Sequence, residues 1–218
     1  MSRGVAGIGM TSQRTRARMI ERLREKGIRD ERVLAAIAAV PRHVFVEEAL
    51  ASRAYEDTAL PLGFSQTISQ PFIVARMIEV LREGRELGKT LEVGAGCGYQ
   101  AAVLAQLTDE VYAVERIEPL LARAKQNMRT IQEFKVRLKY ADGQLGLPEA
   151  APFDTIIVAA AANRVPPSLL QQLALGGRML LPLGTGEQYL LLIERRPEGL
   201  VETRLDAVRF VPLLSGLE

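Results

Sequence analysis

Apolar residues recur at helical spacing in the first part of the chain. Three segments have this pattern and are predicted to be amphipathic helices: residues 12–26, 30–40 and 72–83. Asp30 can cap the second of these helices, and Pro71 suits the first turn of the third. Residues 45–55 are predicted to form another short helix. Residues 60–71 contain two prolines and a glycine, so they are predicted to be a loop.

Beyond about residue 90, short apolar runs alternate with helical periods. The apolar runs predict strands at residues 90–96, 111–115, 136–142, 153–161, 178–184, 189–196 and 202–214. Helices are predicted at residues 98–107, 119–131 and 166–174. This alternation is typical of an α/β fold with a mostly parallel, twisted sheet and helices on both faces. We therefore expect an N-terminal helical segment with a covering loop over residues 1–71, followed by an α/β core over residues 72–218.

Composition and charge narrow the classes of protein that remain. The chain has 218 residues, of which 48% are hydrophobic and 25% charged, as is typical of soluble globular proteins. With 28 Lys and Arg against 26 Asp and Glu, the charge does not indicate a nucleic-acid partner. Six arginines among the first 24 residues, Arg3 the first of them, are interpreted as a solvated helix face or tail. The single Cys97 cannot form an internal disulfide, and no apolar run reaches the roughly 18 residues of a membrane span. We expect a cytoplasmic protein without a membrane partner.

Two glycine-rich stretches are candidate nucleotide loops. The first, "GRELGKT" at residues 84–90, has three residues between its glycines, whereas a phosphate-binding loop has four. It also precedes a predicted strand, whereas a phosphate-binding loop follows one and opens a helix. We interpret it as a turn.

The second stretch, "LEVGAGCGYQAAVLA" at residues 91–105, has the required order of strand, glycine turn and helix. The dinucleotide fingerprint would need a glycine at position 99, where Tyr99 stands. The pattern Glu-x-Gly-x-Gly-x-Gly instead resembles the first motif of Rossmann-like S-adenosylmethionine-dependent methyltransferases. Without Cβ atoms, the turn lets a ligand lie against the backbone. A tight strand-to-helix turn without a ligand is the alternative.

Acidic residues end the next two predicted strands. Glu115 follows 17 residues after Gly98, where a carboxylate can accept hydrogen bonds from both ribose hydroxyls of an adenosine. Asp142 and Gly143 end the third strand, where such methyltransferases hold the adenine. Either acidic residue alone would more often be a solvated strand end. Together and in this order they indicate a methyltransferase that uses S-adenosylmethionine and releases S-adenosylhomocysteine.

Segments outside the cofactor motif carry a more specific resemblance. They are "VPRHVFV" (40–46), "AYEDTALPLGFSQTISQPFIVARMIE" (54–79), "DGQLGLPEAAPFDTIIVAAA" (142–161), "LALGGRMLLPLG" (173–184) and "VRFVPL" (208–213). With the cofactor motifs, they resemble the bacterial protein-L-isoaspartate O-methyltransferase family. The resemblance implies methylation of the free α-carboxylate of L-isoaspartyl residues in damaged proteins and peptides. The ester then collapses to a succinimide, and the enzyme thereby initiates repair.

The resemblance also implies roles for individual residues. Ser69 corresponds to the family's active-site serine. The residues expected to bind the peptide are Asp57, Gln66, Thr67 and Val211. The residues expected to bind the cofactor are Ile68, Gly94, Ala95, Gly96, Glu115, Asp142 and Gly143. Asp57 would orient the substrate loop or accept a peptide N–H, although a cap or turn carboxylate is also possible. No metal is expected, and the protein is expected to be a monomer.

The chemistry explains a polar loop that lacks a strong base. The acceptor carboxylate has a reference pKa near 3.9 and is already ionised at neutral pH, so there is no proton to remove. Hydroxyl and amide donors can orient it in a near-attack geometry. His43, the only histidine, is therefore expected to be structural, and Cys97 to be a small apolar filler in the turn.

The sequence differs from the family pattern at several positions, and it leaves two alternative functions open. Phe64 and Ser65 stand in place of a glycine-containing pair, and Ala95, Cys97 and Ala159 replace hydroxyl residues. These changes affect the expected affinity more than the expected activity. One rival is a methyltransferase acting on a small molecule or RNA, although residues 159–167 offer no aromatic to stack a base. The other is a binding protein that keeps the fold without catalysis.

Overall fold

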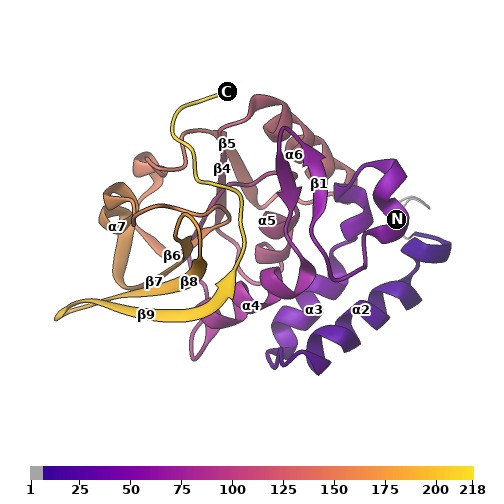
Figure 1. Cartoon of the computed structure of the whole chain (residues 1–218), viewed down its shortest axis with the longest axis horizontal. Coiled ribbons are helices and arrows are strands. Elements are labelled where there is room, and N and C mark those ends of the chain that lie inside the picture. The colour runs from indigo at the N-terminus through magenta and orange to yellow at the C-terminus, as the bar shows by residue number, and fades with distance from the viewer. Residues whose placement is uncertain (1–6) are drawn as a thin grey trace.

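A mostly parallel sheet lies at the centre of the molecule (Figure 1). The computed structural model describes residues 7–218, and over this range the sheet has seven strands in the order β5-β4-β3-β6-β7-β8-β9. They are β3 (Thr90–Val93), β4 (Val111–Glu115), β5 (Val136–Tyr140), β6 (Phe153–Val158), β7 (Leu173–Leu183), β8 (Gln188–Arg196) and β9 (Gly199–Val208). Strands β5 to β7 in that order are parallel, and β8 and β9 extend the sheet antiparallel. The predicted α/β class is confirmed.

Alternating side chains place the sheet between two hydrophobic cores. Ile157 and Leu180 belong to the larger core, which they share with helices α4 (Pro71–Arg82), α5 (Tyr99–Leu104) and α6 (Glu118–Ile131). Their neighbours Ile156 and Met179 belong to the core on the opposite face, with helix α7 (Pro167–Gln172). Such alternation is expected of strands buried on both faces. No helix within residues 7–218 is long and apolar enough to span a membrane.

The predicted N-terminal helical extension is present and packs on the larger core. Helices α2 (Gln13–Glu25) and α3 (Glu31–Ala39) match their predicted segments closely. The Asp30 carboxylate caps α3, because it accepts hydrogen bonds from the backbone N–H groups of Arg32 at 2.9 Å and Val33 at 3.2 Å. Pro71 is the first residue of α4, as predicted. Residues 1–71 and 72–218 contribute to one core, and the division between them stays an expectation.

The arginine-rich start of the chain is only partly solvated. Arg14 and Arg18 are exposed, as expected. Arg16 and Arg22 instead donate hydrogen bonds to backbone carbonyls of later segments, at Ala38 and Tyr55. These contacts tie α2 to the segments that follow it. Arg3 lies outside the described residues.

Residues 45–55 differ from the single helix predicted there. The chain forms two short 3-10 helices, η2 (Arg42–Phe45) and η3 (Glu48–Arg53), separated by two extended residues, Val46 and Glu47. Short 3-10 pieces commonly serve as connectors, because their hydrogen-bond geometry is too poor for long runs. Two further pieces of this kind are η1 (Gly9–Thr11) and η4 (Pro148–Ala150).

The loop predicted at residues 60–71 contains a β-hairpin. Strands β1 (Leu60–Gly63) and β2 (Gln66–Ile68) pair antiparallel through a two-residue turn. Phe64 and Ser65 in this turn have φ values of 51° and 55°, the left-handed region that suits two-residue hairpins. Asn or Gly normally signals such a turn, and neither stands at these two positions. The hairpin therefore left no local signal in the sequence.

The final predicted strand is only partly correct. Strand β9 begins at Gly199 and ends at Val208, whereas the prediction was residues 202–214. From residue 209 the chain leaves the sheet and crosses its carboxyl edge, where Pro212 forms an isolated bridge with Ala161 (Figure 1). Residues 202–208 of the predicted segment pair with β8 as a strand, whereas residues 211–213 pair with the loop after β6. The chain thereby lies over the edge where the site is found.

Candidate functional site

A cavity of about 460 Å³ opens at the carboxyl ends of β3 and β6. Strand β3 pairs in parallel with β4 on one side and with β6 on the other, so β4 and β5 extend the sheet in one direction and β6 and β7 extend it in the other. Open α/β sheets bind ligands at such a switch point. The volume is within the usual range of small-molecule sites. The expected site residues that line it are Gln66, Thr67, Ile68, Ser69, Gly94, Ala95, Gly96, Glu115, Gly143 and Val211.

The glycine turn after β3 forms one wall of the cavity. Gly96 has a φ of 54°, and a Cβ atom added to it would lie 3.5 Å from Leu62 of the hairpin. The Leu62 side chain is the neighbour found within 4 Å of such a Cβ, so this face of the turn is otherwise open. A flat ligand can approach the backbone here, as the motif implies. Gly98 has another function, since a Cβ there would lie 2.9 Å from Met128 of α6.

Glu115 is held rigidly at the end of β4. One carboxylate oxygen accepts a hydrogen bond from Gly96 N at 2.7 Å, and the other accepts from Arg116 N at 2.8 Å and Ile117 N at 3.0 Å. The side chain is buried and lines the cavity. Each carboxylate oxygen can accept more than one hydrogen bond. Glu115 therefore stays able to accept from hydroxyl groups of a ligand.

Two buried polar groups on the cavity wall lack protein partners. Within residues 7–218, no partner is found for Glu92 Oε2 or for Gln100 Nε2. Burial raises the pKa of the Glu92 carboxyl well above its ordinary value, the neighbouring Gln100 amide lowers it in part, and nearby Glu115 raises it. Such groups are rare unless a ligand or water satisfies them. Neither residue was assigned a role from the sequence, although Glu92 is the acidic residue that opens the glycine motif.

The loop around Ser69 is fixed by a buried arginine. Arg42 has 0% exposure and donates Nη2–H to the Ser69 carbonyl at 2.8 Å and Nε–H to the Ala54 carbonyl at 2.9 Å. Its guanidinium also lies 4.7 Å from the ring centroid of Tyr99, the first residue of α5. The Ser69 hydroxyl makes no hydrogen bond to another described residue. The loop is therefore anchored through its backbone, with its hydroxyl left for a ligand.

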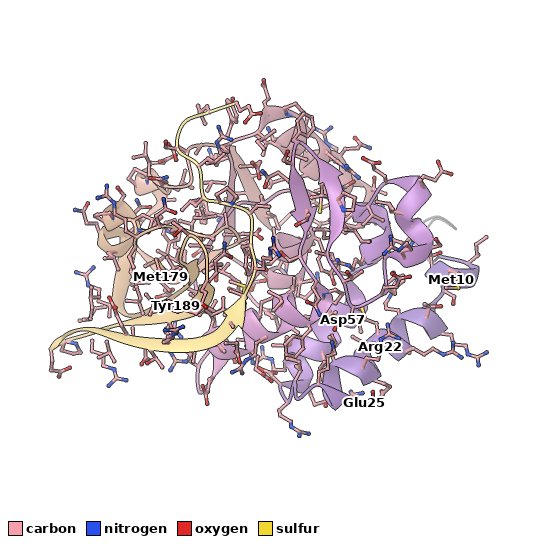
Figure 2. All side chains as sticks on the ribbon, viewed as in Figure 1. Met10, Arg22, Glu25, Asp57, Met179 and Tyr189 are labelled. Atoms are coloured by element: carbon pink, nitrogen blue, oxygen red, sulfur yellow. The ribbon has the colours of Figure 1, made fainter. Side chains whose placement is uncertain are left out.

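Asp57 does not line the cavity, but its carboxylate contacts the residues that follow Ser69. Its carboxylate accepts hydrogen bonds from Gln70 Nε2 at 3.0 Å and from Phe72 N at 2.9 Å, and it pairs with Lys26. Figure 2 shows it beside the carboxyl end of α2. Lys26 and these hydrogen bonds hold the pKa of Asp57 below its usual value, against the effect of burial. Of the two roles considered for Asp57, this geometry agrees with orienting the loop. Binding of the peptide by Asp57 stays a prediction.

Asp142 is also not among the residues that line the cavity. Its carboxylate accepts hydrogen bonds from Gln144 N at 2.8 Å and from Gly216 N at 2.6 Å, whereas the adjacent Gly143 lines the cavity. Adenine binding by Asp142 stays a prediction. The tail that engages it was expected to contribute Val211, which does line the cavity.

Cys97 and His43 have structural surroundings. Burial raises the pKa of the Cys97 thiol to about 11, so it is a thiol at neutral pH. His43 Nδ1 lies 2.7 Å from the Tyr55 hydroxyl, in η2 and outside the cavity lining. Across the described range, no group of three or more His, Cys, Asp or Glu side chains could hold a metal ion.

The strand order, the glycine turn, the acidic residue after β4 and the cavity at the switch point define a Rossmann-like S-adenosylmethionine-dependent methyltransferase. The model of the protein-L-isoaspartate(D-aspartate) O-methyltransferase family matches residues 14–218. The chain belongs to this family.

Relatives and solved structures agree with this membership. A protein-L-isoaspartate O-methyltransferase of Dechloromonas aromatica is 79% identical over 97% of this chain and 99% of its own. One from Aromatoleum aromaticum is 65% identical over 96% of each chain. A solved protein-L-isoaspartate O-methyltransferase superposes with a TM-score of 0.83 at 28% identity, covering 93% of this chain and 67% of that one. A Plasmodium falciparum structure, described as a putative family member in complex with S-adenosyl-L-homocysteine, has a TM-score of 0.75 at 25% identity, covering 90% of this chain and 96% of that one.

Proposed function

We propose that this protein transfers the methyl group of S-adenosylmethionine to the free α-carboxylate of L-isoaspartyl residues in damaged proteins and peptides. The observation that carries the proposal is the match of nearly the whole chain to the isoaspartate family. The position of the polar loop supports it, because residues 66–69 line the same cavity as the glycine turn. A donor of methyl groups and an acceptor carboxylate can thus meet in one cavity.

The cavity wall fits the parts of S-adenosylmethionine. When bound, the cofactor supplies a methyl group that its sulfonium has already activated. We assign Gly94 and Gly96 to the backbone face against which it lies, and Glu115 to its ribose hydroxyls. The unpartnered Glu92 Oε2 suits the amino group of its methionine part, because a buried carboxylate gains most from a cationic partner. We assign Gly143, which lines the cavity, to the surface against which the adenine packs.

The protein's contribution to the reaction is positioning. The Ser69 hydroxyl donates a hydrogen bond to one oxygen of the acceptor carboxylate and leaves the other free to attack. No side chain has to remove a proton, because that carboxylate is ionised at neutral pH. The Leu62 and Ile73 side chains line the cavity and limit the water around the carboxylate. Orientation and partial desolvation together can supply a large part of a rate enhancement.

A pair of matched peptides tests the proposal. One contains an L-isoaspartyl residue and the other an aspartyl residue in the same sequence, each incubated with the protein and radiolabelled S-adenosylmethionine. We expect label on the isoaspartyl peptide and almost none on its twin, since only the former has a free α-carboxylate beside a rerouted backbone. Equal labelling of both peptides would contradict the proposal. Transfer RNA in a third reaction tests the rival substrate class, and preferential labelling of it would favour that class.

A further inference from the structure

The chain beyond β9 forms a tail across the carboxyl edge of the sheet. Figure 1 shows it running from β9 over the ends of the central strands towards β4 and β5. Its middle is fixed at β6, because Ala161 N donates to Val211 O at 2.8 Å and Leu213 N donates to Ala161 O at 2.7 Å. Residues 216–218, which we call the terminal segment, continue to the loops that follow β4 and β5.

Arg116 holds the terminal segment on the β4 side. Its guanidinium donates Nε–H to the Gly216 carbonyl at 2.8 Å and pairs through Nη1 with the Glu218 carboxylate at 2.8 Å. Backbone bonds reinforce this contact, since Glu218 N donates to Arg116 O and Glu118 N donates to Glu218 O, each at 2.8 Å. The Arg116 side chain is only 19% exposed. The Glu218 side chain is 60% exposed, so the anchor is the mostly buried guanidinium with its hydrogen bond to the Gly216 carbonyl, and the ion pair itself lies at the surface.

The same segment is held on the β5 side by a predicted cofactor residue. Gly216 N donates to the Asp142 carboxylate at 2.6 Å, and the Tyr140 hydroxyl donates to Glu218 O at 3.1 Å. The segment therefore bridges the carboxyl ends of β4 and β5, next to Glu115 and Asp142. Arg116 itself lines the cavity and directly follows Glu115. The bridge is at the adenosine end of the proposed cofactor site.

We propose that the terminal segment, which follows Leu214, the last residue of the tail that lines the cavity, forms an outer wall beyond the adenosine end of the cavity, and that Arg116, which does line the cavity, is the positioning residue that fastens this wall. The inference rests on the cofactor assignment made under the proposed function. The wall keeps the β4 and β5 loops at a fixed separation and slows the escape of the bound nucleoside. Release of S-adenosylhomocysteine is then faster when the terminal segment detaches from the β4 and β5 loops.

Dissociation of S-adenosylhomocysteine tests the wall, with rates measured by displacement and affinities by calorimetry. The variants are a chain lacking residues 216–218, Arg116→Gln and the two combined. Arg137→Gln is the control, because Arg137 pairs with Glu110 at the opposite end of β5. We expect each of the first two changes to speed dissociation about three- to tenfold, the range for losing a few charge-assisted hydrogen bonds near the surface. Dissociation from the combined variant should be no faster than from the truncated chain alone, because both changes remove the same contacts between Arg116 and the terminal segment.

Further outcomes separate positioning from a merely structural role. Arg116→Lys keeps the positive charge but cannot donate to two acceptors in the geometry of a guanidinium. Its dissociation rate should lie between those of the wild type and Arg116→Gln. Thermal unfolding should show an intact fold, since the segment is exposed. Unchanged dissociation in the truncated chain would overturn the proposal. Slower dissociation would overturn it too, because it would mean that Gly216 competes with the adenine for Asp142.

The same samples distinguish this inference from the proposed function. A wild-type protein that binds S-adenosylhomocysteine but methylates no isoaspartyl peptide would contradict the proposed function. The dissociation rates would still test the wall in that case, because they require no peptide.

Discussion

Glu92 is a buried acid at the cavity wall, and its environment disfavours the charged form. It is 1% exposed, and no partner for Oε2 is found in the described part of the chain. Its raised pKa couples its protonation to folding. The unfolded chain loses this proton near 4.5, whereas the folded protein keeps it to a higher pH. The stabilising effect of protonated Glu92 is complete below about pH 4.5 and is lost as pH rises through the raised pKa.

Glu92→Gln should therefore stabilise the free protein at pH 8. Glutamine cannot ionise, so the variant avoids the cost of a buried unpaired charge and should gain about 1–3 kcal/mol in the free energy of unfolding. At pH 5 the gain should be smaller. Cofactor affinity should fall, because the proposed partner of the amino group is lost. Urea denaturation at both pH values and calorimetry check this, and equal stability at pH 8 would refute it.

Ser69→Ala should lower turnover with isoaspartyl peptides by about one to three orders of magnitude, the range for a lost positioning donor. Cofactor affinity should stay nearly unchanged, because the hydroxyl is assigned to the acceptor. Steady-state kinetics and calorimetry separate the two effects. The wild-type rate should also be flat between about pH 6 and 8, since the acceptor's reference pKa is near 3.9. A steep limb near pH 6.5 that disappears in His43→Gln would show that a base takes part.

At the scale of elements, the β1–β2 hairpin stores backbone strain at the site. Left-handed φ values cost a non-glycine residue about 1–2 kcal/mol. Ser65→Gly should remove this cost at one position. Glycine also has more conformational entropy in the unfolded chain, which offsets part of the gain, so the free energy of unfolding should rise by about 0.5–1 kcal/mol. Ser52→Gly in η3 is the matched control and should be destabilising. Urea denaturation measures both, and destabilisation by Ser65→Gly would argue against the strained turn.

The elements that sequence patterns predicted well are those whose own side chains determine them. Strand β4 was predicted at its observed bounds, because an apolar run between a turn and an acidic residue can hardly form anything else in this context. Strand β7 begins at Leu173, five residues before the prediction, because pairing with Phe153 of β6 extends it through two glycines. Tertiary pairing of this kind leaves no periodic signal in the sequence.

The same distinction applies to the site. Motif order predicted the glycine turn and Glu115, resemblance predicted the loop at Ser69, and all of them line the cavity. The partners of the loop could not be predicted, because Arg42 acts through a backbone carbonyl and Lys26 pairs with Asp57 from another helix. The contact of Gly216 with Asp142 likewise joins residues 74 positions apart in the chain. No local pattern specifies such contacts.

At the scale of the whole molecule, the N-terminal helices and the sheet share one core. Ile37 of α3 is fully buried in it. Ile37→Ala should lower the free energy of unfolding by about 2–5 kcal/mol, as for other buried isoleucines. The loss should appear in a single transition that includes the sheet. Ile8→Ala is the control, because Ile8 is 81% exposed. Separate transitions for helices and sheet, seen by circular dichroism and by hydrogen exchange, would contradict a shared core.

The single thiol gives the molecule a built-in reporter of its own opening. Cys97 is 2% exposed at the centre of the glycine turn, and its pKa of about 11 keeps it unreactive as well as inaccessible. Cys97 belongs to the lining of the cavity, so an alkylating reagent reaches the thiol when the cavity wall around the turn loosens. The labelling rate under native conditions would thus record how often the cavity region opens, with no engineered probe and no second cysteine to confuse the signal.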